Sequence, residues 1–274
     1  GIVRDKLGRK MSKSLGNSPD PIMLIDKFGA DGVRMGMLLT APAGNDIPFD
    51  ESICEQGRNF ANKIWNALRL VKGWEVSDTD KQSNENAVSV QWMEMRMACV
   101  LEEIEKDFDD FRLSEALMKS YKLVWDDFCS WYLEMVKPAY GTPIDRETYE
   151  ATISIFDRLV RILHPFMPFV TEEIWHTLRP ACREGKSIMV ETMPRSVDFD
   201  QQFLADFATT QEIIANVRGL RNSKGLSPKE QLELHIRGNH PAQFDGIVMK
   251  LANLSKIEVI ENKLEGALSF MVGT

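Results

Sequence analysis

The chain has 274 residues, more than one compact core usually fills, so we expect two or three domains. Its net charge of −8 argues against a protein coated in nucleic acid, and no apolar run approaches the roughly 20 residues that a membrane helix needs. Because the four cysteines lack C-x-x-C pairing and the four histidines lack H-E-x-x-H spacing, we expect reduced thiols in a cytoplasmic protein and no protein-bound metal.

The first feature along the chain is a cationic loop in the stretch GRKMSKSLGNSPDP, residues 8–21. It places Lys10 and Lys13 three residues apart between serines and glycines, with no hydrophobic run around them. Two mobile ammonium groups suit a polyanion whose charge moves during a reaction, and the hydroxyls of Ser12 and Ser14 add donors. A triphosphate is the candidate ligand, but a K-x-x-K pair alone is more often a solvated basic turn.

Helices are predicted from residue 21 onward. Asp20 before Pro21 is a capping pair for a short helix in PIMLIDKFG, and GADGVRMGMLL predicts a second helix. From residue 51 a longer amphipathic helix is expected, with Ser52 and Glu55 at capping-box spacing. Its apolar stripe comprises Phe60, Ile64, Leu68 and Val71. Its opposite side carries Arg58, Asn62, Trp65, Arg69 and Lys72.

More helices are predicted at 86–110, 114–136 and 145–163, and from about 171 to 180. In the helix at 114–136 an apolar seam recurs at alternating steps of four and three; it consists of Leu117, Tyr121, Val124, Phe128, Trp131 and Met135. Pro138 ends that helix, and the HPFMPF run, with its two prolines, separates the next two. Short connections make an antiparallel bundle the simplest architecture.

A different unit is expected after residue 195. One more helix with a basic end covers FATTQEIIANVRGLRNSKG, and QLELHIR alternates like a half-buried strand. A short helix around 241–253 and the strands KIEVIE and ALSFMV complete this unit. The chain is therefore predicted to be mainly α, with an antiparallel helical bundle followed by a small α/β domain.

The pentapeptide in the cationic loop resembles the second signature, KMSKS, of class I aminoacyl-tRNA synthetases; it consists of Lys10, Met11, Ser12, Lys13 and Ser14. The surrounding GRKMSKSLGN, Asp20-Pro21 and FGADGVR are similar to that family too, with one departure at Ser18-Pro19, where apolar residues are expected. RNFANKIWNALRL, APAGNDIPFD, FCSWYLEMVKP and LRNSKGLSPKEQLEL resemble the valine-specific members more than those for isoleucine or leucine.

The resemblance covers essentially the entire chain and implies the carboxyl-terminal part of such an enzyme, because no HIGH string and no strand–Gly-rich–helix unit is present. It implies the end of the catalytic domain at 1–50, an anticodon-binding bundle at 51–195 and a small α/β domain, truncated at its end, at 196–274. The full enzyme would use ATP, with Mg²⁺ as its counter-ion, to join valine to tRNA(Val), as a monomer and without a membrane. The fragment alone is expected to be inactive.

The resemblance gives the loop and the bundle separate roles. Lys10 and Lys13 would be catalytic by stabilising the pyrophosphate of ATP, and all five residues of the pentapeptide would bind ATP, with Met11 packing as an anchor. The tRNA-binding candidates are Arg58, Asn62, Trp65 and Arg69, with Asn66 and Lys63 in second rank. The alternative is that the tryptophan packs inside and the arginines merely solvate the helix.

Two further groups of basic residues are candidates for RNA contact. The first consists of Arg158, Arg161 and His164, and the second of Arg218, Arg221 and Lys224. The first group either meets the same RNA or pairs with the acidic run EEIEKDFDD at 102–110, which is expected to be a solvated face. The second group either contacts the RNA backbone or forms a solvated helix end.

Two other interpretations of the whole chain stay open. One is the equivalent segment of an isoleucine or leucine enzyme, which keeps the chemistry and changes the amino acid. The other is a stand-alone helical module for RNA binding or protein interaction that retains the loop as a relic. Sequence upstream of the loop would discriminate between a ligase segment and such a module.

Overall fold

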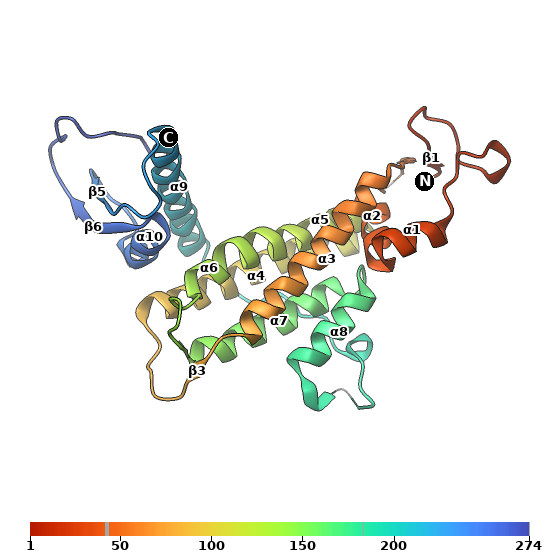
Figure 1. The fold of residues 1–274 in the computed structure, drawn as a ribbon, viewed down its shortest axis with the longest axis horizontal. Helices are drawn as coiled ribbons and strands as arrows, with labels where there is room; N and C mark the ends of the chain where they lie inside the picture. Colours follow the sequence, from red (N-terminus) through yellow and green to blue (C-terminus); the bar gives the residue numbers. More distant parts are fainter. Residues whose placement is uncertain (42–43, 183, 274) are drawn as a thin grey trace.

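The structure is a computed structural model that describes residues 1–41, 44–182 and 184–273. A helical bundle forms its middle, the first fifty residues lie at one end, and a small unit with the carboxyl terminus lies at the other (Figure 1). The first part contains the helices α1 (Pro21–Phe28) and α2 (Ala30–Leu39), the 3-10 turn η1 (Lys13–Leu15) and the short parallel strands β1 (Val3–Arg4) and β2 (Ile47–Pro48). The predicted mainly α fold is confirmed.

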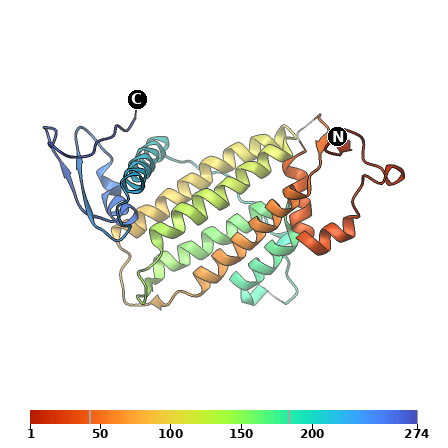
Figure 2. The ribbon, with the colours of Figure 1, turned by 45° about the horizontal axis from the view of Figure 1, so that its top comes forward.

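Antiparallel helices form the bundle, and they lie side by side in Figure 2. They are α3 (Glu51–Lys72), α4 (Asn84–Asp109), the continuous α5–η2–α6 (Leu113–Lys122, Leu123–Tyr132 and Leu133–Val136) and α7 (Arg146–Leu163), with α8 (Pro168–Leu178) beside them. The two-residue strands β3 (Val76–Ser77) and β4 (Ile144–Asp145) pair in parallel at one end. Short 3-10 turns, η3 (Pro180–Cys182) and η4 (Ile188–Val190), follow α8.

Helix α3 has the predicted core stripe but a different cap. Phe60, Ile64, Leu68 and Val71 are all buried, as their helical spacing requires. The predicted cap at Ser52 is wrong, because the carboxylate of Asp50 accepts the hydrogen bond from the Ser52 amide at 2.9 Å. An aspartate at this position also faces the positive end of the helix dipole, which favours its negative charge.

The predicted seam of the 114–136 helix is correct only in part. Leu117, Val124 and Phe128 are buried, but Trp131 is only half-buried, and the fully buried ring is that of Tyr132. The reason is the π-helical segment η2, in which each hydrogen-bonded turn takes one residue more than in an α-helix. The buried face therefore moves along the sequence, and the Tyr132 hydroxyl bonds that of Thr152 at 2.7 Å.

The last unit contains α9 (Gln201–Ser223), β5 (Leu232–Ile236), η5 (Ala242–Phe244), α10 (Asp245–Ala252) and β6 (Leu254–Val259). Strands β5 and β6 pair in parallel. The strand predicted for ALSFMV is wrong, because residues 267–272 form no ladder. The apolar residues of that segment instead place Phe270 and Val272 against the core.

The main hydrophobic core extends from the first part of the chain through the bundle into the last unit. It includes Met35 on α2, Trp92 on α4 and Leu254 on β6. The Trp92 and Phe207 rings have centroids 4.3 Å apart, which joins α4 to α9 directly. The domain boundaries predicted at residues 50 and 195 stay predictions, and the core continues across both.

Three glycines bring α2 and α3 unusually close. A Cβ atom on Gly57 would lie 2.3 Å from the Gly32 carbonyl oxygen, and one on Gly36 would lie 2.6 Å from the Ile53 carbonyl oxygen. Real Cβ atoms do not approach oxygen so closely, so only glycine allows the two backbones this separation. Gly32 and Gly36 are one helical turn apart and therefore share the face of α2 that meets α3.

We predict that Gly57→Ala lowers the free energy of unfolding by about 1–3 kcal/mol, because overpacking outweighs the gain in helix propensity. Gly219→Ala in α9 is the matched control, since nothing lies within 4 Å of a Cβ atom there. That control should be neutral or stabilising by up to about 1 kcal/mol. Urea unfolding of both variants checks this, and equal stability changes at the two positions would refute the close contact.

Candidate nucleotide loop and nucleic-acid interface

The cationic loop is held at its base by backbone and amide hydrogen bonds. The Met11 amide donates to the Val3 carbonyl at 2.9 Å, and Gly16 closes the turn with φ 63°, where glycine is unstrained. The Asn17 side chain accepts from the Ser12 amide at 2.9 Å and donates to the Asp5 carboxylate at 3.0 Å and the Lys10 carbonyl at 3.3 Å. These bonds tie both sides of the loop together.

Asp5 is the centre of this arrangement. Besides the Asn17 amide, its carboxylate accepts the backbone amides of Leu7 and Arg9, at 3.0 and 2.9 Å, and pairs with the Arg9 guanidinium at 2.7 Å. The hydrogen bond from Asn17, together with those from Arg9, holds the pKa of Asp5 well below its usual range. The carboxylate is therefore ionised at neutral pH and organises the base of the loop.

The loop presents its lysines outward and its methionine inward. Lys10 and Lys13 are exposed, and neither has an ion-pair partner among the residues that the structure describes. Met11 packs against the small cluster of Leu24, Phe28, Phe49 and Cys54, so the predicted anchoring is confirmed. The Ser12 hydroxyl accepts from the Leu15 amide and lies 3.1 Å from the Ser14 hydroxyl. Two exposed ammonium groups thus stand on an ordered base, without an acidic partner in the part of the chain that the structure describes.

The outer face of α3 keeps four of the predicted RNA-binding side chains free. Asn62, Trp65, Asn66 and Arg69 are all exposed. The alternative in which Trp65 packs inside is wrong, since the residue is 36% exposed. Arg58, nearer the start of α3, is half-buried: it pairs with Glu55 at 3.2 Å and lies 5.7 Å from the centre of the Phe28 ring.

Lys63 lies beside two aromatic residues. The sequence pattern predicts one of them, Tyr121, in the core seam and makes no prediction for the other, Trp125. The Lys63 ammonium group is 5.2 Å from the centre of the Trp125 ring, which stacks on Tyr121 with centroids 5.6 Å apart. Both aromatic rings are only half-buried. The signal in the sequence was the position of Trp125 itself, four residues after Tyr121 and off the predicted seam.

The basic stripe on α7 pairs with acids other than those predicted. Arg158 forms a two-pronged ion pair with Glu94. Arg161 pairs at 3.0 Å with the buried Asp157, which Arg179 also contacts at 2.5 Å. Pairing of this stripe with the run at 102–110 is therefore wrong. That run has other local partners, among them Lys119 and the Ser196 amide. Contact of Arg158 and Arg161 with RNA stays a prediction.

The basic end of α9 mostly holds the last unit together. The buried Arg221 guanidinium donates to the carbonyls of Ser227, Glu230, Ala252 and Asn253. Arg218 donates twice to the Leu251 carbonyl, at 3.0 and 2.8 Å. Both predictions for Arg221, RNA contact and a solvated helix end, are wrong, because the connection after α9 folds back over it.

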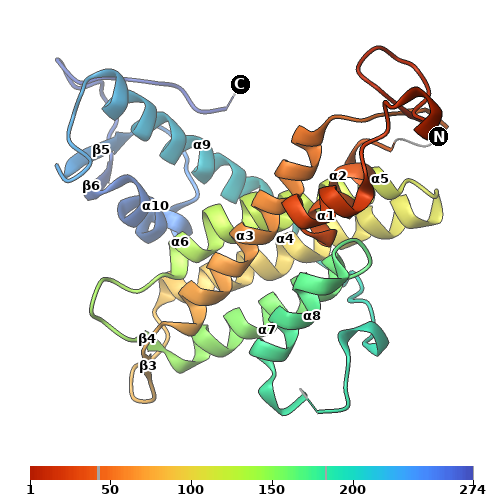
Figure 3. The same ribbon diagram turned by 45° about the vertical axis from the view of Figure 1, so that its right-hand side comes forward.

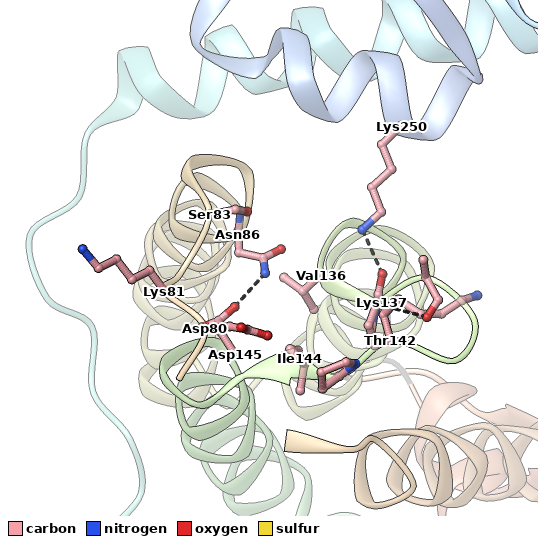
Figure 4. Close-up of a pocket in the computed structure, with 13 residues that line it drawn as sticks. Asp80, Lys81, Ser83, Asn86, Val136, Lys137, Thr142, Ile144, Asp145 and Lys250 are labelled. Atoms are coloured by element: carbon pink, nitrogen blue, oxygen red, sulfur yellow. Dashed lines mark hydrogen bonds between the residues drawn. The ribbon is translucent and has the colours of Figure 1, made fainter. Parts of the chain in front are cut away.

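A cavity of about 360 Å³ lies at the opposite end of the bundle from the cationic loop. Figure 4 shows Lys250 of α10 reaching from above toward α6, and Asn86 bonded to Asp145. The Lys250 ammonium group donates to the carbonyls of Met135 and Lys137 at 2.5 and 2.9 Å, and burial lowers its pKa. Lys250 therefore joins α10 to the bundle, whereas the Asn86–Asp145 bond lies within the bundle.

Residues 90–236 match the family described as the anticodon-binding domain of tRNA ligase, and residues 1–50 match tRNA synthetases class I (I, L, M and V). The chain belongs to this family of tRNA ligases. It is 57% identical to the valine–tRNA ligase of Parabacteroides distasonis and 55% identical to that of Bacteroides thetaiotaomicron, over its whole length. The chain spans 31% of the length of each of these relatives.

Solved structures support the same fold. The LeuRS of Agrobacterium radiobacter K84, in a ternary complex with tRNA and LeuAMS, matches with a TM-score of 0.51 at 16% identity. The match covers 94% of this chain and 32% of that one. In the part of the chain that the structure describes, no three His, Cys, Asp or Glu residues gather as metal ligands, and no helix is long and apolar enough to cross a membrane.

His164 is the residue from which we expect a pH-dependent stability. It lies between α7 and α8, where its Nδ1 bonds the Thr171 hydroxyl at 2.8 Å, and burial lowers its pKa despite nearby Glu172 and Asp31. Below about pH 6.5 the unfolded chain therefore binds more protons at this residue than the folded chain does, and the stability that His164 contributes is lost on acidification.

We predict that wild type loses more unfolding free energy between pH 7 and pH 5 than His164→Gln does, because glutamine cannot titrate. Urea unfolding at both pH values measures the difference. The same loss of unfolding free energy is measured for His240→Gln as a comparison. That variant removes a histidine paired with Asp245 in the last unit. Identical pH dependence in wild type and His164→Gln would contradict the assignment.

Proposed function

We propose that this chain is the segment of a valine–tRNA ligase that supplies the ATP loop and the tRNA-binding bundle. The ligase activates valine with ATP and transfers it to tRNA(Val). The observation that carries the proposal is 57% and 55% identity, across the whole chain, to proteins named valine–tRNA ligase. An isoleucine or leucine enzyme is disfavoured, since these relatives, which match the whole chain, are named for valine. A stand-alone module is disfavoured because the similarity includes the cationic loop.

The loop's part is electrostatic. The carboxylate of valine attacks the α-phosphorus of ATP, pyrophosphate leaves, and negative charge grows on the departing phosphates. Ammonium groups aimed at this developing charge lower the barrier more than they strengthen ground-state binding. Lys10 and Lys13 fit this role because they are exposed and have no ion-pair partner within residues 1–41, 44–182 and 184–273. Met11 and Ser12 fix the loop beneath them. Mg²⁺ enters with the nucleotide, whose charge it balances.

The bundle's part is to bind tRNA. Exposed bases of an RNA loop are recognised by stacking on aromatic rings or guanidinium planes and by hydrogen bonds to their edges. Trp65, Arg69, Asn62 and Asn66 present these chemistries together on one face of α3. The remaining candidates flank this face or lie on α7; they are Arg58, Lys63, Arg158 and Arg161. We also propose that the protein acts in the cytoplasm, as a monomer, and that this segment alone is inactive.

For catalysis we predict that Lys13→Ala slows ATP–pyrophosphate exchange about a hundredfold, the equivalent of about 3 kcal/mol, with nearly unchanged valine affinity. The variant is made in a full-length valine–tRNA ligase that carries this chain in the matching segment. Lys6→Ala is the control, since that nearby ammonium group pairs with Asp50 at 2.6 Å instead of facing outward alone. A normal exchange rate in Lys13→Ala would remove the role assigned to it.

For RNA binding we predict that the chain binds tRNA(Val) more tightly than a transcript with a swapped anticodon. Arg69→Ala should weaken binding and, if the guanidinium contacts phosphate, reduce the slope of log K against log salt by about 1. Trp65→Ala should weaken binding and reduce the anticodon preference. Fluorescence anisotropy measures all of these, with Lys106→Ala on the acidic side of α4 as control. Equal affinity for both transcripts would exclude sequence-specific recognition of the anticodon by the bundle.

A further inference from the structure

Helix α2 holds the turn between α7 and α8 through two side chains. Figure 3 shows α1 and α2 above the start of α8, although about 130 residues of chain separate them. The turn comprises residues 164–167, and α8 begins at Pro168. The two side chains are Asp31 and Arg34, which lie one helical turn apart on α2. Asp31 accepts from backbone N–H groups, and Arg34 donates to backbone carbonyls.

Asp31 binds the amino end of α8. Its carboxylate is 6% exposed and accepts the amides of Phe169 and Val170, at 3.3 and 2.6 Å. Those amides belong to the first turn of α8, where helical N–H groups have no partner within the helix. The aspartate therefore caps α8 from another helix, and its negative charge faces the positive end of the dipole. Burial raises the pKa of Asp31, while these bonds and the nearby Arg34 oppose the shift.

Arg34 binds the other side of the same turn. Its guanidinium donates to the carbonyls of Phe166 and Pro165, at 3.2 and 3.1 Å. Phe166 is itself buried and stacks on Phe108 of α4, with ring centroids 6.1 Å apart. The turn is thus a fixed part of the bundle, and the arginine attaches α2 to it.

The carboxyl end of α2 is attached to the bundle as well. The Ser114 hydroxyl of α5 lies within bonding distance of the Leu38 and Ala41 carbonyls, at 2.8 and 2.6 Å. Between the two ends, glycines hold α2 against α3. Helix α1 and the small cluster that anchors Met11 pack against these same helices. The orientation of α2 on the bundle therefore decides where the lysines of the loop stand.

We propose that Asp31 and Arg34 are positioning residues that keep the ATP loop in register with the tRNA-binding bundle during amino acid transfer. This inference rests on the proposed function. Activation of valine needs the loop but no tRNA, whereas transfer needs a tRNA bound to the bundle to reach the activated amino acid. A loosened attachment should therefore impair transfer and spare activation.

The test uses Asp31→Asn in a full-length valine–tRNA ligase that carries this chain. We expect kcat/KM for tRNA in aminoacylation to fall about tenfold, mainly through KM, while ATP–pyrophosphate exchange without tRNA stays within about twofold. Arg34→Met should show the same split. Arg34→Lys should restore part of the loss, because its ammonium group can reach one of the two carbonyls.

Asp145→Asn is the matched control. Asp145 is also 6% exposed and also caps a helix, accepting the Thr148 amide at 2.8 Å, but it does so within the bundle. It should lower stability without separating the two activities. The positioning role is overturned if Asp31→Asn lowers aminoacylation and ATP–pyrophosphate exchange in parallel. It is also overturned if the difference between the two losses is no larger than in Asp145→Asn.

A second measurement does not depend on catalysis. In the chain itself, Asp31→Asn should speed hydrogen exchange at the Phe169 and Val170 amides relative to amides in the middle of α7. Unchanged exchange there would overturn the attachment. If the unmodified ligase fails to charge tRNA(Val), the proposed function falls, and the exchange measurement still decides whether Asp31 holds α8.

Discussion

The contact between α2 and α3 is the constraint on which the rest of the arrangement depends. Gly32, Gly36 and Gly57 let two helix backbones meet where any side chain would separate them. At this separation Met35 reaches the main core and is fully buried. A wider separation would also move Asp31 away from the amides of α8, so the helix contact and the polar attachment require each other.

Helix α3 connects the cationic loop with the face proposed to bind RNA. Its 22 residues extend about 33 Å at 1.5 Å per residue, from the region of the loop to the far end of the bundle. Arg58 near its start lies over the Phe28 ring of α1, which belongs to the cluster that anchors Met11. Trp65 and Arg69 lie two to three turns further along the exposed side. A rigid helix thus fixes the distance between the cationic loop and the proposed RNA-binding face, and its buried stripe packs in the core.

Local patterns in the sequence predicted most helices because burial on one side of an α-helix repeats every 3.6 residues. They failed where the backbone leaves that period or where a distant group decides. In the π-helical segment η2 the buried side chain is Tyr132 and not the predicted Trp131. No feature of the composition marks such a segment. The ALSFMV segment alternates like a strand, but alternation gives no ladder without an adjacent strand. Its Phe270 and Val272 side chains pack on the core instead. The pattern around Arg221 predicts a surface residue, because the connection that covers this side chain follows later in the chain.

In the candidate site, too, the sequence predicts the features formed by neighbouring residues and misses those formed by distant ones. The pentapeptide loop was identified because all of its residues are contiguous, and the bonds that hold it join residues at most 12 positions apart. The attachment of α2 to α8 joins residues more than 130 positions apart, so no local pattern contains it. One local sign existed: Asp31 is a charged residue that shares a short helix with the fully buried Met35. Burying a carboxylate is costly unless hydrogen-bond donors meet it. Asp31 in this helix therefore implies donors on a neighbouring element, and backbone amides without a partner are one such kind. The first turn of a helix is the commonest source of such amides, and the start of α8 provides them.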